Sequence, residues 1–125
     1  MTDDATFPNT AAQRATGDWN PTWDLLRELD PDYLEAFLGF RAVPQRKGPL
    51  AQKYKEMIFI AINAATTHLH GPGVRRHIQN ALRAGATKEE ILEVIELTTI
   101  MGIHSMTLAA PILQEEVARF NQNQA

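Results

Sequence analysis

The segment that decides the predicted fold is residues 50–67, which read LAQKYKEMIFIAINAATT and have a hydrophobic second half. No proline or glycine interrupts it, and at 1.5 Å per residue it predicts a helix of roughly 27 Å. Its second half is apolar on every side except at Asn63, as in helices that are buried all round. The alternative is a buried strand over Met57–Ile62, but no second strand-like run exists to pair with it. A chain this small can hardly surround such a helix, so we expect other subunits to cover it.

Two shorter helices are predicted before this segment. Asn20–Pro21 and Asp30–Pro31 each place a capping side chain before a proline at the first helical position. The second helix should stop near Ala42, because Pro44 disfavours helical backbone at the residue before it. The polar residues 1–20 show no sustained apolar period and are predicted to be a flexible or partner-wrapping arm, which would need a neighbour to become ordered. The side chains expected to be partly buried in the second helix are Tyr33, Leu34, Phe37, Leu38 and Phe40.

Three more helices are predicted after the hydrophobic segment. Gly71–Gly73 breaks the chain, and a helix then runs up to Gly85, which has the place of a C′ glycine. Thr87–Glu90 is a capping box that starts the next helix. Gly102 should end or kink that helix, and a last one covers about His104–Phe120. The whole pattern predicts an all-α protein of about six helices, with residues 21–125 as a single domain.

Composition and charge limit the classes of function. The chain has 125 residues, and its 12 basic and 15 acidic side chains give a net charge of −3, so it offers no basic surface for nucleic acid. The uncharged run Met57–Leu69 is too short for a bilayer, which needs about 20 residues, and the Asp-rich start is unlike an export signal. We therefore expect a cytoplasmic protein with no nucleic-acid or membrane partner. The absence of cysteine excludes disulfides and thiol redox chemistry.

Imidazole and carboxylate groups gather around the hydrophobic segment. Glu56 lies near its start, and His68, His70 and His77 follow its end. Imidazole titrates near neutral pH and can exchange a proton twice in one reaction cycle. His77 is therefore a candidate for general acid and base, with Glu56 orienting or recharging it. Each also has a simpler explanation, since His77 borders an apolar stripe and can be a core histidine, and Glu56 can belong to a solvated helix face.

Two motifs follow one another along the chain: Gly48-Pro49-Leu50-x-x-Lys53-x-Lys55-Glu56-Met57-Ile58 and His77-x-x-x-Ala81-x-x-x-Gly85-Ala86-Thr87-x-Glu89-Glu90-Ile91-x-Glu93-Val94. Together they resemble the carboxymuconolactone decarboxylase family, which includes the alkylhydroperoxidase D-like proteins. The similarity covers about residues 45–112. The resemblance implies an all-α domain that usually assembles as trimers or hexamers, with an active site between helices near a subunit contact.

The chain departs from the peroxidase branch of that family. In that branch a Cys-x-x-Cys pair precedes the histidine by seven and four residues, and here those positions hold His70 and Gly73. Thiol-dependent peroxide reduction is excluded, because no other side chain here can form the sulfenate and the disulfide. The family residues that do match are Glu56 and His77.

Decarboxylation, the reaction that the resemblance implies, suits the remaining residues and needs no metal and no organic cofactor. The resemblance predicts a lyase of aromatic-compound catabolism that acts on a small carboxylated lactone or keto acid. His68 and His70 are expected to donate to an oxyanion, and Gly73 to present the N–H groups of a helix start to a carboxylate. Arg75 or Arg76 can add a clamp, although only one of them can face the pocket. The residues predicted to bind the substrate are His68, His70, Gly73, Arg76 and His104.

Three alternatives remain open. The chain can be a non-enzymatic small-molecule binding protein on the same fold. It can also be a metal-dependent enzyme, because His68, His70, His77 and Glu56 carry suitable ligand atoms, although their spacing matches no established metal motif. At least one of His68 and His70 can instead be a charged cap at the end of the hydrophobic helix.

Overall fold

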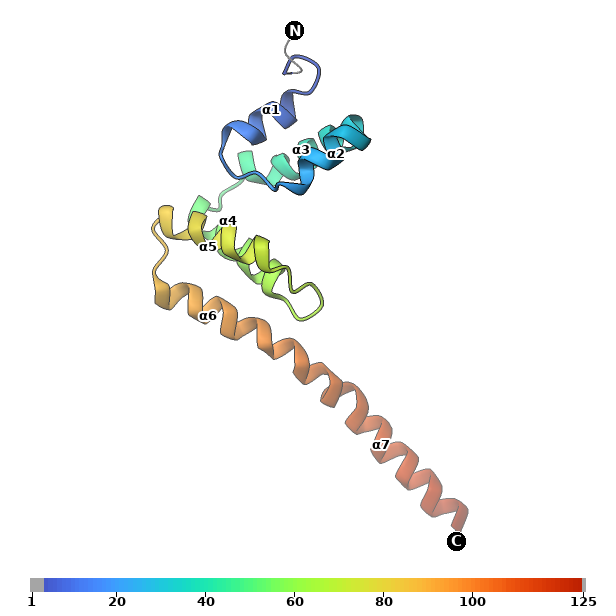
Figure 1. The fold of residues 1–125 in the computed structure, drawn as a ribbon. Coiled ribbons are helices and arrows are strands. Elements are labelled where there is room, and N and C mark those ends of the chain that lie inside the picture. The colour runs from blue at the N-terminus through green and yellow to red at the C-terminus, as the bar shows by residue number, and fades with distance from the viewer. Residues whose placement is uncertain (1–3, 125) are drawn as a thin grey trace. The chain divides into compact units, whose positions relative to one another are not determined.

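The computed structural model describes residues 4–124, which form seven α-helices, one 3₁₀ helix and no strand (Figure 1). The all-α fold class is therefore confirmed, and the strand alternative for Met57–Ile62 is wrong. Contacts divide the chain into two compact units, which we call unit 1 (described residues up to Gln52) and unit 2 (from Lys53 onward). Each unit has a small hydrophobic core of its own, and we describe the two separately.

Unit 1 contains three helices: α1 (Pro8–Ala15), α2 (Thr22–Leu29) and α3 (Pro31–Arg46). Both α1 and α2 pack against α3. The carboxylate of Asp30 accepts a hydrogen bond from the backbone N–H of Tyr33 at 3.0 Å, so the predicted cap of α3 is confirmed. The core of the unit consists of Trp23, Leu34 and Leu38, with Trp19 and Leu26 packed against it.

The end of α3 and part of its predicted buried face differ from expectation. The helix continues through Pro44 to Arg46, so the predicted end near Ala42 is wrong. A proline inside a helix removes one hydrogen bond and crowds the preceding turn, which can kink the helix without ending it. Leu34 and Leu38 are buried as expected, whereas Tyr33 and Phe40 are 63% and 78% exposed.

Glu35 explains why the N-terminal segment is helical where a flexible arm was predicted. Its carboxylate accepts hydrogen bonds from the backbone N–H and side-chain amide of Asn9 at 2.7 and 2.8 Å. It also accepts from the backbone N–H and hydroxyl of Thr10 at 2.8 and 2.7 Å. A carboxylate at a helix N-terminus satisfies free N–H groups and complements the helix dipole. The flexible-arm prediction is wrong for residues 8–15, and the domain boundary at residue 20 stays a prediction.

The Glu35 cap predicts that unit 1 loses stability in acid. Burial raises the pKa of Glu35, but the hydrogen bonds from Asn9 and Thr10 outweigh burial and hold the pKa below its ordinary value of 4.5. The stabilisation is therefore complete above that value and is lost as the pH falls through the lowered pKa. We expect Glu35→Gln to reduce the free energy of unfolding by about 1–3 kcal/mol at neutral pH, and the difference from wild type to shrink in acid.

Urea unfolding followed by tryptophan fluorescence measures this effect, because both tryptophans, Trp19 and Trp23, lie in unit 1. Glu28→Gln, on the exposed side of α2, removes the same charge as a control. A Glu35→Gln midpoint equal to that of Glu28→Gln at neutral pH would contradict the capping role.

Unit 2 contains α4 (Gln52–Ala64), α5 (Gly71–Arg83), α6 (Lys88–Thr98), the 3₁₀ helix η1 (Thr99–Gly102) and α7 (Ile103–Gln124). The predicted capping box of α6 is confirmed, with reciprocal hydrogen bonds of 3.1 and 3.0 Å between Thr87 and Glu90. Gly85 has a φ of +95°, which favours glycine at the end of α5. The core of the unit consists of Ile60, Ala81, Ala86 and Ile91, with Met57, Ile78, Val94 and Ile95 packed against it.

The hydrophobic helix α4 is only partly covered by its own chain. Its buried residues are Glu56, Ile60 and Asn63, which share one face at helical spacing. Ile58 and Ile62, on other faces, are 48% and 50% exposed. The expectation that other subunits cover this helix stays a prediction.

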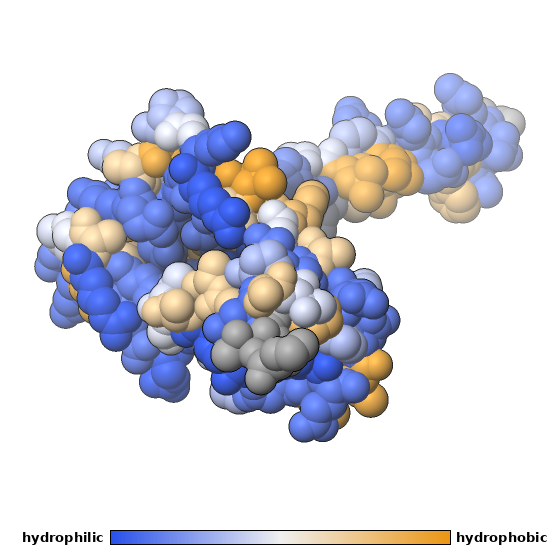
Figure 2. Space-filling view, turned by 90° about the horizontal axis from the view of Figure 1, so that it is seen from above, coloured by the Kyte–Doolittle hydropathy of each residue, from blue (hydrophilic) through white to orange (hydrophobic). Residues whose placement is uncertain are grey.

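The C-terminal helices expose a long apolar surface. Residues 88–124 form a nearly continuous helix that is long and apolar enough to cross a membrane, with a mean hydropathy of 1.3 over its most apolar 18-residue window. The prediction that no segment is long enough to span a bilayer considered Met57–Leu69. The uncharged run in residues 97–114 is longer, so that prediction used the wrong segment. No residue of α7 is buried within this chain, and Figure 2 shows hydrophobic side chains at its surface.

Candidate active site

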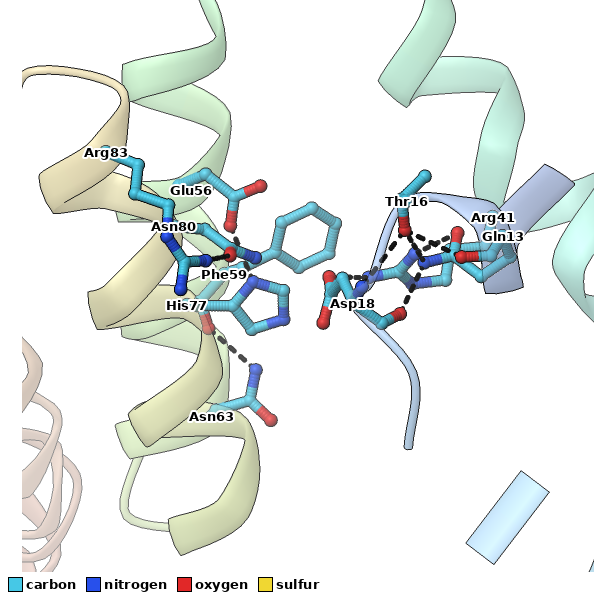
Figure 3. Close-up of polar contacts among 10 residues, drawn as sticks. All are labelled: Gln13, Thr16, Asp18, Arg41, Glu56, Phe59, Asn63, His77, Asn80 and Arg83. Carbon is cyan, nitrogen blue, oxygen red and sulfur yellow. Dashed lines mark hydrogen bonds and ion pairs between the residues drawn. The ribbon is translucent and has the colours of Figure 1, made fainter. Parts of the chain in front are cut away.

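Glu56 and His77 meet inside unit 2, as the sequence predicted. Glu56 lies on the buried face of α4, and His77 lies on the buried face of α5 between Gly73 and Ala81. Nδ1 of His77 is 2.6 Å from Oε2 of Glu56, and the two residues are only 3% and 4% exposed (Figure 3). The explanation of Glu56 as part of a solvated face is therefore wrong.

The carboxylate fixes the tautomer of His77. An ionised carboxylate can only accept hydrogen bonds, so Nδ1 of His77 carries a proton and donates it to Glu56. In the neutral ring Nε2 then keeps its lone pair and can take up a proton. If His77 becomes an imidazolium, the adjacent carboxylate stabilises the positive charge. The pair therefore has the chemistry of an oriented acid and base.

Phe59 holds the plane of the same imidazole. Its ring is stacked on that of His77, with centroids 4.7 Å apart and an angle of 16° between the planes (Figure 3). Phe59 lies on α4 between Glu56 and Asn63. Stacking and the hydrogen bond to Glu56 together restrict both the tilt and the rotation of the ring. The sequence did not single out Phe59, because an aromatic residue in an apolar helix is usually a core residue.

Asn63 forms a second polar contact between the ends of α4 and α5. Its side-chain amide donates to the backbone carbonyl of Phe59 at 2.8 Å, and its Oδ1 is 3.2 Å from Nδ1 of His70. The backbone N–H of His70 also donates to the carbonyl of Asn63 at 2.8 Å. Asn63 is 8% exposed, so these contacts lie within the helix pair. The sequence had marked it only as the polar exception in an apolar run.

The Gly71–Gly73 segment is the first turn of α5 and not a break in the chain. Pro72 is tolerated there because the N–H groups of a first helical turn have no partner within the helix. His70 is the N-cap residue, where the helix dipole favours negative charge. The predicted role of a charged histidine at the end of the hydrophobic helix is therefore wrong for His70. His68 is exposed, and its ring lies 5.7 Å from that of His70.

A cavity of about 550 Å³ lies against the N-terminal half of α5. Arg75 lines this cavity, whereas Arg76, the arginine predicted to bind the substrate, does not. None of the other predicted substrate-binding residues lines it. One lining residue, Leu69, has a φ of +47°, which a non-glycine residue rarely adopts and which often marks a functional segment. The cavity is lined by Asn63, Ala64, Leu69, Gly71, Val74, Arg75, Ile78 and Gln79.

The remaining candidates are not brought to the Glu56–His77 pair by this chain. His104 lies on α7, where every described residue is exposed. Within residues 4–124, no three His, Asp or Glu side chains are arranged to hold a metal ion.

Comparison with known proteins identifies the family. Residues 31–115, more than half of the chain, match the model of the Carboxymuconolactone decarboxylase family. The chain belongs to this family. The resemblance predicted from the motifs around Glu56 and His77 is thereby confirmed. No curated protein gave a significant match.

A solved structure shares the fold of this carboxymuconolactone decarboxylase family member. It is a candidate gamma-carboxymuconolactone decarboxylase subunit from Burkholderia xenovorans LB400, 42% identical in sequence, with a TM-score of 0.83. The match covers 95% of this chain and 48% of the other, so this chain spans about half the length of that neighbour. The name of the family and the description of the Burkholderia structure both refer to a decarboxylase, which associates this family with decarboxylation.

Proposed function

We propose that this protein is a cofactor-free carboxy-lyase that acts on a small carboxylated lactone or keto acid. The observation that carries the proposal is the buried pair of Glu56 and His77, joined at 2.6 Å between α4 and α5. Family membership supports the reaction class, because the family is named for a decarboxylase.

The reaction needs one leaving group and one proton. The bond between the substrate carbon and its carboxylate breaks, CO₂ leaves, and the electron pair moves into the conjugated carbonyl to form a dienolate. A proton must then return to carbon. In the proposed mechanism the protonated Nε2 of His77 delivers it, and Glu56 stabilises the imidazolium until that transfer. Solvent then restores the proton, so no oxidant or reductant is consumed.

The cavity beside α5 supports binding of a small anion with an apolar body. Val74 and Ile78 supply apolar surface, and Arg75 supplies a guanidinium that can bind a carboxylate. We therefore assign the predicted arginine clamp to Arg75 in place of Arg76. The N-terminus of α5 adds a favourable dipole for the same charge.

A non-enzymatic binding protein is the second candidate function. The observation that favours it is that the lining of the cavity does not include Glu56 or His77. A molecule bound in the cavity then need not react with the pair.

Release of CO₂ distinguishes the two functions. The purified protein is incubated with γ-carboxymuconolactone and with a series of small keto acids, and CO₂ is measured beside calorimetric binding of the same compounds. The decarboxylase proposal expects turnover of at least one carboxylated lactone or keto acid. Binding without CO₂ release across the series would favour the second function and contradict the first.

We also propose a cytoplasmic homo-oligomer, with three or six subunits as the family resemblance implies. The exposed apolar side chains of α4 and α7 support this assembly, because contiguous apolar surface usually marks an interface. The Burkholderia neighbour is described as a subunit, which also supports an assembly of several chains.

Charges placed on α7 are expected to dissociate the assembly. Met106 and Leu113 are 63% and 65% exposed and lie seven residues apart, on one face of the helix. The double variant Met106→Glu with Leu113→Glu should therefore give a smaller particle in light scattering coupled to size exclusion. Gln122→Glu adds a charge elsewhere on α7 and should leave the mass unchanged. A monomeric wild type, or an unchanged mass in the double variant, would contradict assembly through α7.

A further inference from the structure

The polar contact between Asn63 and His70 is separate from the Glu56–His77 pair and has no role in the mechanism above. We propose that Asn63 is a positioning residue that holds His70 with its proton on Nδ1. In this state Nε2 of neutral His70 is a proton acceptor toward a molecule bound beside the helix pair. The tautomer follows from the contacts of this chain alone, whereas the role toward a bound molecule rests on the proposed function.

The hydrogen bonds of Asn63 determine which side of its amide faces His70. The backbone carbonyl of Phe59 can only accept, so the NH₂ group of Asn63 must face it at 2.8 Å. The other amide atom, Oδ1, is then directed to Nδ1 of His70 at 3.2 Å. Because Oδ1 can only accept, Nδ1 of His70 must carry a proton and donate it. The Phe59 carbonyl thus fixes the His70 tautomer through Asn63.

The packing around Asn63 shows that this arrangement is built into the helix pair. A Cβ atom at Gly73 would lie 2.1 Å from Oδ1 of Asn63 and 2.7 Å from Nδ1 of His70. Both atoms therefore occupy the space that any larger residue at position 73 would fill. The backbone hydrogen bond from His70 to the carbonyl of Asn63 holds the two residues together independently of their side chains.

This tautomer changes the role expected for His70. An oxyanion donor needs an N–H group directed at the ligand, but in neutral His70 the ring proton is used in the bond to Asn63. Nε2 of the neutral ring is instead an acceptor, so it can accept a hydrogen bond from a hydroxyl group but cannot donate one to an oxyanion. The structure therefore pairs each fixed imidazole with its own orienting group, Glu56 for His77 and Asn63 for His70.

Nuclear magnetic resonance of the imidazole nitrogens tests the tautomer without any substrate. The spectra are recorded on the full chain at a pH where the rings are neutral, and the His70 signals are assigned with His70→Gln. We expect wild type to show a protonated Nδ1 and an unprotonated Nε2 at His70. Asn63→Ala should move both nitrogens to the averaged positions of a mixed tautomer and leave His77 unchanged. Gln79→Ala removes an exposed amide from α5 and should leave His70 as in wild type.

The outcomes separate this inference from the proposed function. A wild-type His70 with its proton on Nε2 would overturn the inference even if the protein releases CO₂. An unchanged His70 pattern in Asn63→Ala would also overturn it. If that variant is unstable, Asn63→Leu keeps a side chain of similar size without a hydrogen-bond acceptor and should give the same mixed tautomer. In an active protein, Asn63→Ala should lower kcat, and an unchanged kcat with a mixed tautomer would contradict the role of Nε2 toward the ligand.

Discussion

Glu56→Gln is expected to reduce the rate constant for CO₂ release by about 100- to 10,000-fold, the range for a disabled acid–base group. Glutamine is close in shape to glutamate, so the packing between α4 and α5 changes little. The substitution removes the negative charge 2.6 Å from Nδ1 of His77, and with it the stabilisation of the imidazolium. The new amide can also donate to Nδ1, which places the ring proton on Nε2. His77→Gln should cause a loss of the same order.

Glu93→Gln is the matched control for the Glu56 variant, because Glu93 lies on the exposed side of α6 and the same charge is removed. It should keep the wild-type rate. Thermal unfolding and light scattering of each variant separate a catalytic loss from a folding defect. Wild-type turnover in Glu56→Gln, or loss of folding in both Glu56→Gln and His77→Gln, would support a purely structural pair.

Gly73→Ala is expected to destabilise unit 2 by about 1–3 kcal/mol, the usual cost of overpacking a buried site. The added Cβ would lie 2.1 Å from Oδ1 and 2.6 Å from Cγ of Asn63. Asn63 is buried and must therefore move, which weakens its hydrogen bonds to Phe59 and His70. The higher helix propensity of alanine offsets only part of this cost, since it contributes less than about 1 kcal/mol.

Gly71→Ala provides the control within the same helical turn. A Cβ at Gly71 has no atom within 4 Å, so alanine should be neutral or stabilising by up to about 1 kcal/mol. The two variants share the chemical change and differ in the contact with Asn63. Urea unfolding followed by circular dichroism measures both. Equal stability of Gly73→Ala and Gly71→Ala would contradict the close packing of Asn63 against α5.

Local signals in the sequence predicted most helix ends. The Asp30 cap, the Thr87–Glu90 capping box and the glycine at position 85 depend on residues within one turn of one another, and the structure confirms all three. The flexible arm was wrong because α1 depends on Glu35, more than 20 residues away. Pattern reading within a short window cannot detect a cap of that kind.

The part of the candidate site that depends on motifs and helical spacing could be predicted from the sequence, whereas the part that depends on long-range contacts could not. Glu56 and His77 match family motifs, and the helical spacing places both on buried faces. The choice between Arg75 and Arg76 depends on the phase of α5, and neighbouring residues differ by about 100° in direction. Asn63 carried a signal, as the polar residue of an apolar run, but its partner His70 lies across a loop whose path the sequence does not determine.

The most direct test of the account is product analysis after reaction with γ-carboxymuconolactone in D₂O containing a metal chelator. The account predicts that CO₂ is released and that one deuterium is incorporated at a carbon of the dienolate. His77→Gln should lose this reaction while it stays folded. A folded His77→Gln variant that releases CO₂ at the wild-type rate, or a wild-type protein that releases none from any carboxylated lactone or keto acid, would contradict it.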